Sequence, residues 1–281
     1  MSDQPHNYTK STHRKKNTER GKKSLASTKS ARLNRIGDKV WIYGRHSVTA
    51  LMANPHRTIH RIVVTESGLR SLGAMARSFY RYSFEILSKE TLESLIPPNA
   101  VHQGFAVLAD PLPNFDLTHL IETKSNGENI LFLALDRVND PQNLGAILRS
   151  AAGFGCNGII VPDKNTPNVS GTVAKAASGA LEIVPIIRVI NLSRTLKMLK
   201  KNGFWIVGMD VNGDTILSET ELPDKCVLTM GSEGRGLRPL TRKNCDLIAQ
   251  IPLKPEIQSL NLSATAAIGL YEWSRKETKK L

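Results

Sequence analysis

A polar segment in the middle of the chain carries side chains suited to binding an anion. Asn143 and Arg149 follow the apolar run 131–136 and lie near the start of an expected helix. Arginine presents a rigid fork of N–H donors that suits phosphate, and asparagine offers both a donor and an acceptor. Because the two residues are six positions apart, close to two helical turns, they can project to similar sides of that helix. The pattern fits a phosphate or developing anion beside Arg149, and it fits equally a well-capped helix with a surface arginine.

A second segment, Met230–Gly236, is rich in glycine and follows another apolar run. Its three glycines let the backbone approach a ligand closely because glycine has no Cβ. Ser232 and Glu233 lie at the tip of the expected loop. Ligands of parallel α/β folds bind at the carboxyl ends of the strands, so this position favours a site over a simple glycine-rich connection.

A third segment, Ile251–Ser263, joins the last apolar run to the last expected helix. Ser259, Asn261 and Ser263 are all residue types that cap helix amino termini, so capping alone explains at least one of them. A polar run of this length is more than one cap needs, which favours a functional role by a small margin.

Alternating strands and helices would bring the three segments together. We expect strands at 130–136, 158–162, 183–187, 204–209, 226–230 and 247–251, and helices at 143–153, 170–179, 192–202, 236–243 and 262–277. Near-continuous apolar strands separated by helices are typical of a parallel sheet covered on both faces. On pattern alone, the expected fold is an open doubly wound α/β sheet with its crevice at the carboxyl ends of the strands.

The pattern divides the chain into a basic tail (1–37), a small α/β domain (38–110), a linker (111–129) and the parallel-sheet domain (130–281). In the small domain we expect strands at 59–64, 84–87 and 104–109, and helices at 46–53, 69–80 and 89–95.

Positive charge is concentrated in the tail. Residues 1–36 contain ten Lys or Arg against Asp3 and Glu19, which is a net +8 of the formal +13 of the chain. The tail has almost no apolar residues and is expected to be disordered. It suits an electrostatic arm for RNA phosphates, although a solubilising leader without a specific role explains the same composition.

Cysteine use and hydropathy restrict the class of protein further. Cys156, Cys226 and Cys245 are few and scattered, which argues against a disulfide framework or structural zinc site and suits a reducing cytoplasm. The sequence has no apolar run of about 18 residues that would span a membrane, and no histidine or carboxylate cluster suggests a metal.

Taken together and in this order, the three segments resemble the motifs of the SpoU (TrmH-type) family of RNA ribose 2′-O-methyltransferases. The resemblance covers about 130–275, and it extends to 41–109, where Ile42–Leu51 and Val101–Gly104 look like the RNA-binding domain of the family. Chains that combine both parts resemble most the enzymes that methylate a guanosine ribose in large-subunit (23S) ribosomal RNA.

The resemblance implies a role for each site residue. S-adenosylmethionine would be held by the backbone at Gly231, Ile251 and Leu260, beside Met209 and Met230. Arg149 would activate the ribose hydroxyl together with an RNA phosphate. The remaining catalytic candidates, which would orient the substrate and Arg149, are Asn143, Glu233, Ser259 and Asn261.

The resemblance also implies a fold and an assembly that the pattern does not show. The carboxyl-terminal segment of the family passes through a loop to form a trefoil knot where the cofactor binds, although threaded chains are rare. The first domain is similar in fold to ribosomal proteins that bind RNA turns. The family acts as a cytoplasmic homodimer with its catalytic sites at the interface, and it uses no metal.

Two other functions fit parts of the same pattern. A tRNA guanosine 2′-O-methyltransferase of the family would share the three motifs, and the small domain favours ribosomal RNA only by analogy. A catalytically inactive RNA-binding or ribosome-assembly protein would keep the fold, but the presence of Asn143, Arg149, Glu233 and Asn261 argues against it.

Overall fold

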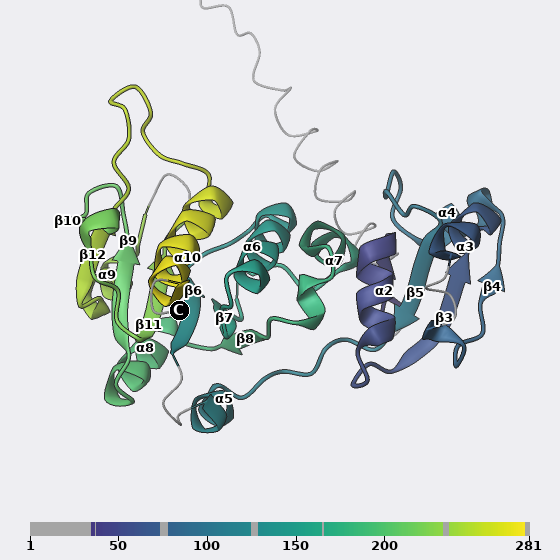
Figure 1. Cartoon of the computed structure of the whole chain (residues 1–281), viewed down its shortest axis with the longest axis horizontal. Helices are drawn as coiled ribbons and strands as arrows, with labels where there is room; N and C mark the ends of the chain where they lie inside the picture. Colours follow the sequence, from purple (N-terminus) through teal and green to yellow (C-terminus); the bar gives the residue numbers. More distant parts are fainter. Residues whose placement is uncertain are drawn as a thin grey trace, which may run out of the picture.

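The computed structural model describes residues 35–36, 38–73, 78–124, 129–164, 166–232 and 236–278. Two β-sheets form the centres of two units that lie side by side along the long axis of the molecule (Figure 1). We call residues 35–109 the amino-terminal unit and residues 130–278 the carboxyl-terminal unit. The tail that we expect to be disordered falls, apart from Arg35 and Ile36, outside the described residues.

The amino-terminal unit is built on a five-stranded sheet with the strand order β1-β2-β5-β3-β4. Strands β3 and β4 are parallel, whereas the other neighbouring pairs are antiparallel. Its elements in chain order are β1 (Arg35–Ile36), β2 (Lys39–Tyr43), α2 (Arg45–Ala53), β3 (Ile59–Val64), α3 (Glu66–Leu72), β4 (Glu85–Ile86), α4 (Lys89–Leu95) and β5 (Phe105–Ala109).

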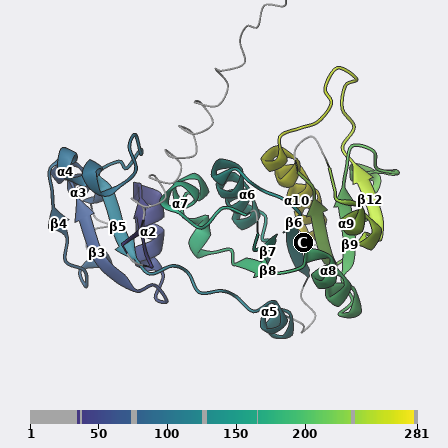
Figure 2. The ribbon, with the colours of Figure 1, turned by 180° about the vertical axis from the view of Figure 1, so that it is seen from behind.

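The two faces of this sheet belong to different apolar cores. Side chains alternate along β2, so Trp41 packs with Leu92 of α4 on one face, and Ile42 packs with Leu51 of α2 on the other. The core that contains Ile42 continues without interruption into the carboxyl-terminal unit. Helix α2 therefore lies between the two sheets (Figures 1 and 2).

Helix α3 differs from the helix expected at 69–80. It begins earlier because the Thr65 hydroxyl accepts a hydrogen bond from the Gly68 N–H at 3.1 Å and caps the first turn. It ends at Leu72, before Gly73, whose φ of +53° cannot continue a right-handed helix. The expected strands at 59–64 and 104–109 and the expected helix at 89–95 match β3, β5 and α4 closely.

The carboxyl-terminal unit contains a seven-stranded parallel sheet with the order β10-β12-β9-β11-β6-β7-β8. The expectation of a parallel α/β sheet is thus confirmed. Its strands are β6 (Ile130–Leu135), β7 (Gly158–Pro162), β8 (Ile186–Val189), β9 (Trp205–Met209), β10 (Thr215–Ile216), β11 (Lys225–Met230) and β12 (Leu247–Gln250). Its helical segments are α6 (Pro141–Gly153), α7 (Gly171–Ala177), η2 (Ala180–Glu182), α8 (Leu192–Lys201), η3 (Leu217–Glu219), α9 (Pro239–Asn244) and α10 (Leu262–Thr278).

Helices cover both faces of this sheet. Along β6, Leu133 packs into the core formed with α6, α7 and α10, and Phe132 packs into the core formed with α8. The second core also contains Leu117 and Ile121 of α5 (Leu117–Lys124), a helix within the segment expected to be an irregular linker. Burial of these two apolar side chains explains why that segment is ordered into a helix.

The strand expected at 183–187 is partly wrong. Helix α7 ends at Ala177. The next residue, Ser178, is in the left-handed region, and Gly179 has a φ of +95°, so the chain turns sharply there. A short 3₁₀ helix, Ala180–Glu182, follows, and the strand begins only at Ile186. Strand β10 was not expected, because two residues carry too little hydrophobic pattern to be recognised.

Helix α6 positions the first polar segment and begins two residues before its expected start. The Asp140 carboxylate accepts a hydrogen bond from the Gln142 N–H at 2.9 Å, and Pro141 occupies the first turn. Both features favour a helix start, because the carboxylate satisfies a free N–H and proline needs no N–H partner there.

Gly145 allows α6 and α7 to approach each other closely. A Cβ at this position would overlap the Cβ of Ala176 and would lie 2.8 Å from the carbonyl oxygen of Val173. The absence of a side chain at Gly145 is therefore a packing requirement as well as part of the polar segment.

We predict that Gly145→Ala lowers the free energy of unfolding by about 1–3 kcal/mol, because the added methyl group forces the two helices apart. Urea denaturation followed by circular dichroism measures the change. The matched control is Gly153→Ala at the end of α6, where an added Cβ meets no atom within 4 Å. The control should be neutral or slightly stabilising, and an equal loss in both variants would contradict the packing argument.

Candidate active site

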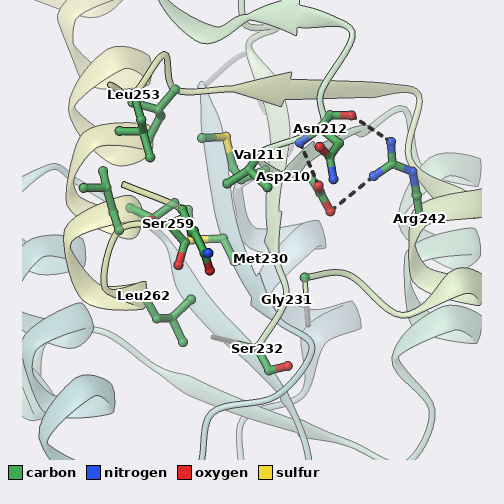
Figure 3. A pocket seen from close by; sticks show the side chains of 16 residues that line it. Asp210, Val211, Asn212, Met230, Gly231, Ser232, Arg242, Leu253, Ser259 and Leu262 are labelled. Carbon is green, nitrogen blue, oxygen red and sulfur yellow. Dashed lines mark hydrogen bonds and ion pairs between the residues drawn. The ribbon is translucent and has the colours of Figure 1, made fainter. Parts of the chain in front are cut away.

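A cavity with a volume of about 430 Å³ lies at the carboxyl ends of three neighbouring strands (Figure 3). This volume lies within the range typical of small-molecule sites. Its walls are formed by Met209, Asp210, Val211, Asn212, Met230, Gly231, Ser232, Gly236, Arg242, Ile251, Leu253, Gln258, Ser259, Leu260, Leu262 and Thr265.

Strand register brings these walls together. Met230 at the end of β11 pairs with Met209 at the end of β9, and Met209 in turn pairs with Ala249 of β12. Because parallel strands end at the same edge of the sheet, the loops that follow β9, β11 and β12 surround one space. The five residues expected to contact the cofactor all line this cavity: Met209, Met230, Gly231, Ile251 and Leu260.

The glycine-rich segment enters and leaves the cavity as a narrow turn. The Ser232 N–H donates to the Gly236 carbonyl oxygen at 3.2 Å, and the Gly236 N–H donates back to the Ser232 carbonyl at 3.0 Å. A Cβ at Gly231 would overlap the Gly236 carbonyl group, so only glycine fits there. Glu233, expected with Ser232 at the tip, lies outside the described residues, as does Gly234.

The third segment contacts the first through a pair of amides. Asn261 Nδ2 donates to Asn143 Oδ1 at 3.1 Å and thereby joins the start of α10 to the start of α6. Asn261 Oδ1 accepts from the Ser263 N–H at 2.8 Å and from Ser263 Oγ at 2.6 Å, so it also caps α10. Ser259 lines the cavity just before this contact.

Arg149 occupies a different position from the other candidates. Its side chain is exposed on α6, and among the described residues it does not form part of the cavity wall. An exposed guanidinium on this helix is accessible to a large polyanion. The structure thus brings Asn143 and Asn261 together and leaves Arg149 facing solvent.

A buried carboxylate holds the glycine-rich loop at both of its ends. The Asp136 N–H donates to the Met230 carbonyl oxygen at 2.8 Å, just before the loop. Just after the loop, the Asp136 carboxylate accepts from the Arg238 N–H at 3.0 Å and from Arg238 Nε at 2.7 Å. Arg238 Nη2 also contacts this carboxylate, and Thr241 Oγ1 donates to it at 3.0 Å. Hydrogen bonding to Asp136 raises the pKa of Arg238.

Sequence reasoning missed a polar group on the β9 side of the cavity. Arg242 lies 3.2 Å from the Asp210 carboxylate and donates to the Asn212 carbonyl oxygen at 3.1 Å. The Asn212 N–H donates to Asp210 Oδ1 at 3.0 Å, which completes the set of contacts in Figure 3. The position of Asp210 in the sequence could have indicated this group, since Asp210 directly follows an apolar strand, as Asp136 does.

The described residues contain no group of three His, Cys, Asp or Glu side chains that could hold a metal ion. Burial raises the pKa of the Cys156 and Cys245 thiols to about 12, so both are protonated at neutral pH and neither is an activated nucleophile. No helix within the described ranges is long and apolar enough to cross a membrane.

Two family descriptions match the chain. Residues 130–271 match the SpoU rRNA methylase family, and residues 41–115 match the substrate-binding domain of RNA 2′-O ribose methyltransferases. The two matches cover the two units of the structure.

Individual relatives match over most of the chain. A 23S rRNA (guanosine-2′-O-)-methyltransferase from Coxiella burnetii is 40% identical over 240 residues, which is 84% of this chain and 95% of the relative. The protein of the same name from Neisseria meningitidis serogroup B is 36% identical over 85% of this chain and 96% of the relative. The SpoU methyltransferase AviRb of Streptomyces viridochromogenes was solved with AdoMet. Its structure matches this one with a TM-score of 0.73 at 22% identity, over 91% of this chain and 98% of AviRb. The last match shows a shared fold.

We predict that Asp136→Asn lowers the free energy of unfolding by roughly 1.5–3 kcal/mol, because hydrogen bonds to a charged group are replaced by weaker ones. Urea denaturation measures the change. The matched control is Asp163→Asn, whose carboxylate is 65% exposed and lies 3.7 Å from Arg188. The control should change stability by less than about 0.5 kcal/mol. A loss at Asp136 no larger than in the control would exclude the anchoring role.

Proposed function

Because this chain belongs to the SpoU rRNA methylase family, we propose that it transfers a methyl group from S-adenosylmethionine to the ribose 2′-OH of a guanosine in 23S ribosomal RNA. The observation that carries the proposal is the cavity in which the glycine-rich and carboxyl-terminal segments meet. The similarity over 84% of the chain to a 23S rRNA guanosine methyltransferase supports guanosine as the methylated nucleotide and 23S rRNA as the substrate.

The cavity offers the contacts that an adenosine sulfonium needs. Met209 and Met230 provide apolar, polarisable walls, and the backbone at Gly231, Ile251 and Leu260 provides N–H and C=O groups for the base and ribose. Bound there, S-adenosylmethionine supplies an electrophilic methyl group. Gly231 lies so close to Gly236 that a side chain at position 231 is excluded, which leaves the backbone of Gly231 accessible to a ligand.

The remaining residues would align the hydroxyl for in-line displacement. The 2′-OH is a poor nucleophile until its proton is withdrawn, and alignment supplies much of the rate. Arginine keeps its proton in proteins, so Arg149 would stabilise the forming alkoxide and fix the adjacent RNA phosphate at least as much as it would act as a base. The proton of the 2′-OH would pass to that phosphate or to solvent. Asn143, Glu233, Ser259 and Asn261 would orient the substrate and the loops around it.

The family resemblance supports a finer description of the fold. Residues 251–261 and α10 would form the part of the chain that passes through a loop, producing the trefoil knot at the cofactor site. The protein would act as a homodimer with its catalytic sites at the interface. A site shared between copies would account for the position of Arg149 outside the cavity wall of its own chain.

Each part of the chain would have its own task. Residues 38–110 would bind substrate RNA, residues 111–129 would link the domains, and residues 130–281 would carry the methyltransferase. Residues 1–37 would add electrostatic attraction for RNA phosphates. A cytoplasmic location suits a protein that acts on ribosomal RNA.

We predict that Arg149→Ala lowers methyl transfer by on the order of 10²–10³-fold, because stabilisation of the developing anion is lost. Its affinity for S-adenosylmethionine should stay unchanged. Transfer of labelled methyl groups to unmodified 23S rRNA, and separately to unmodified tRNA, measures activity, and calorimetry measures cofactor affinity. The complementary control is Gly231→Ala, which should lose cofactor binding because its methyl group overlaps the Gly236 carbonyl.

Three outcomes would overturn parts of this proposal. Labelling of tRNA alone would keep the chemistry and change the substrate. Loss of cofactor binding in folded Arg149→Ala would remove the assigned role of that residue. Absence of cofactor binding by the unmodified protein would favour an inactive RNA-binding relative.

Deletion of residues 1–36 should weaken RNA binding and reduce its dependence on salt, because ten positive charges are removed. Filter binding over a series of salt concentrations gives the slope of log affinity against log salt. An unchanged slope would reduce the tail to a leader without a role in RNA binding.

A further inference from the structure

The two units of the chain meet along a continuous seam. On the amino-terminal side it is formed by β2, α2 and the loop that ends at Arg57, and on the carboxyl-terminal side by α7 and η2. Figures 1 and 2 show α2 directly beside α7 in opposite views. This seam lies apart from the cavity, and nothing in the proposed mechanism uses it.

A buried ion pair crosses the seam. Arg57 Nε donates to Glu182 Oε2 at 3.0 Å, and Arg57 Nη2 donates to Glu182 Oε1 at 3.0 Å, so the pair is bidentate. The two side chains are only 2% and 5% exposed. Asn54 Nδ2 donates to Glu182 Oε2 at 2.8 Å, and Arg57 Nη1 donates to the Asp110 carbonyl oxygen at 2.6 Å. Both carboxylate oxygens of Glu182 and all three guanidinium nitrogens of Arg57 therefore form hydrogen bonds with the protein.

Close packing extends along the seam. A Cβ at Gly171 would lie 2.5 Å from the Trp41 carbonyl oxygen, and a Cβ at Gly179 would lie 2.9 Å from the Ala50 Cβ. Ser47 Oγ, which is buried, donates to the Ala174 carbonyl oxygen at 2.8 Å. The apolar core is shared by both units along the seam. Packing of this kind admits one relative placement of the units.

The segments expected to contact RNA lie at the exposed edge of the same seam. Gln103 Oε1 accepts from Lys175 Nζ at 2.5 Å and from the Arg45 N–H at 3.2 Å. Burial lowers the pKa of Lys175. Residues from the proposed RNA-binding unit thus contact α7, which packs directly against the helix that carries Arg149.

We propose that Arg57 and Glu182 are positioning residues that fix the amino-terminal unit on the carboxyl-terminal unit of the same chain, so that RNA held by the first presents its ribose to the second in one geometry. The inference rests on the proposed function for the part that concerns RNA. The docking itself rests on the seam alone. An ion pair this deeply buried cannot lose one partner without leaving a charge unpaired, which makes it an effective lock.

Pulsed EPR distance measurement tests the docking without reference to activity. Spin labels at Tyr80→Cys and Ile190→Cys report on one exposed position in each unit, 88% and 99% exposed, in a Cys245→Ser background. The labelled protein is mixed with an excess of unlabelled protein, so that a dimer carries at most one labelled chain. We expect a single narrow intra-chain distance distribution in this reporter protein and a broad one after Glu182→Gln. Arg57→Met, which removes the other partner, serves as the second variant should the first fail to fold.

The chain offers a matched control. Arg61 and Glu85 form a bidentate pair with distances of 3.0 and 2.7 Å, but their side chains are 39% and 44% exposed and the pair lies within the amino-terminal unit. Glu85→Gln therefore breaks the same chemistry without crossing the seam and should leave the distribution narrow. A broad distribution in the unmutated reporter, or a narrow one in both seam variants, would overturn the docking.

Kinetics test the consequence for RNA. We expect Glu182→Gln to lower kcat/KM for 23S rRNA by on the order of 10–100-fold through misplacement of the substrate. The affinity for S-adenosylmethionine should not change, and Glu85→Gln should behave as the unmutated protein. Full activity in a seam variant with a broad distance distribution would overturn the positioning role. Absence of transfer by the unmutated protein would instead contradict the proposed function and leave the distance result valid.

Discussion

The cavity depends on one buried carboxylate, Asp136 at the end of β6. Its backbone N–H contacts Met230 before the glycine-rich loop, and its side chain contacts Arg238 after the loop. Asp136 thus holds both ends of the glycine-rich loop. Gly231 at the start of this loop has no side chain with which to hold the loop in place. A buried carboxylate is costly without partners, so satisfying Asp136 obliges the chain to return to this point. The wall of the cavity follows from that requirement.

A second buried acid, Glu182, performs a comparable task at the seam between the two units. Glu182 has its side-chain partners in the amino-terminal unit, where Arg57 and Asn54 donate hydrogen bonds to its carboxylate. Both acids join segments far apart in sequence, and both lie beside glycines that permit close approach. Apolar burial supplies most of the stability of each unit, whereas these polar junctions determine how loops and units are placed. The amide pair of Asn143 and Asn261 adds a third such junction near the chemistry.

Local pattern was sufficient for much of the fold and for half of the site. Apolar patterns identified β6 and α6, although α6 begins at Pro141 instead of the expected 143, and the residues expected at the cofactor wall do line the cavity. The order of the strands could not be read in this way, because β11 lies between β6 and β9 through contacts of long sequence separation. The Arg57–Glu182 pair, 125 residues apart, was invisible for the same reason. The pairing of Asp210 with Arg242 was not predicted, although Asp210 follows a strand, because neither residue lies in the three polar segments that indicated a site.

The strand order has a consequence for how the protein is made. Strand β6 is synthesised early in the carboxyl-terminal unit, yet its neighbour β11 comes about ninety residues later. During translation one edge of β6 therefore stays unpaired, and such edges attract other strands. The cavity also needs Leu262 and Thr265 of the last helix. A nascent chain cannot build the complete pocket until α10 has begun to emerge, so ligand binding cannot assist the earlier steps of folding.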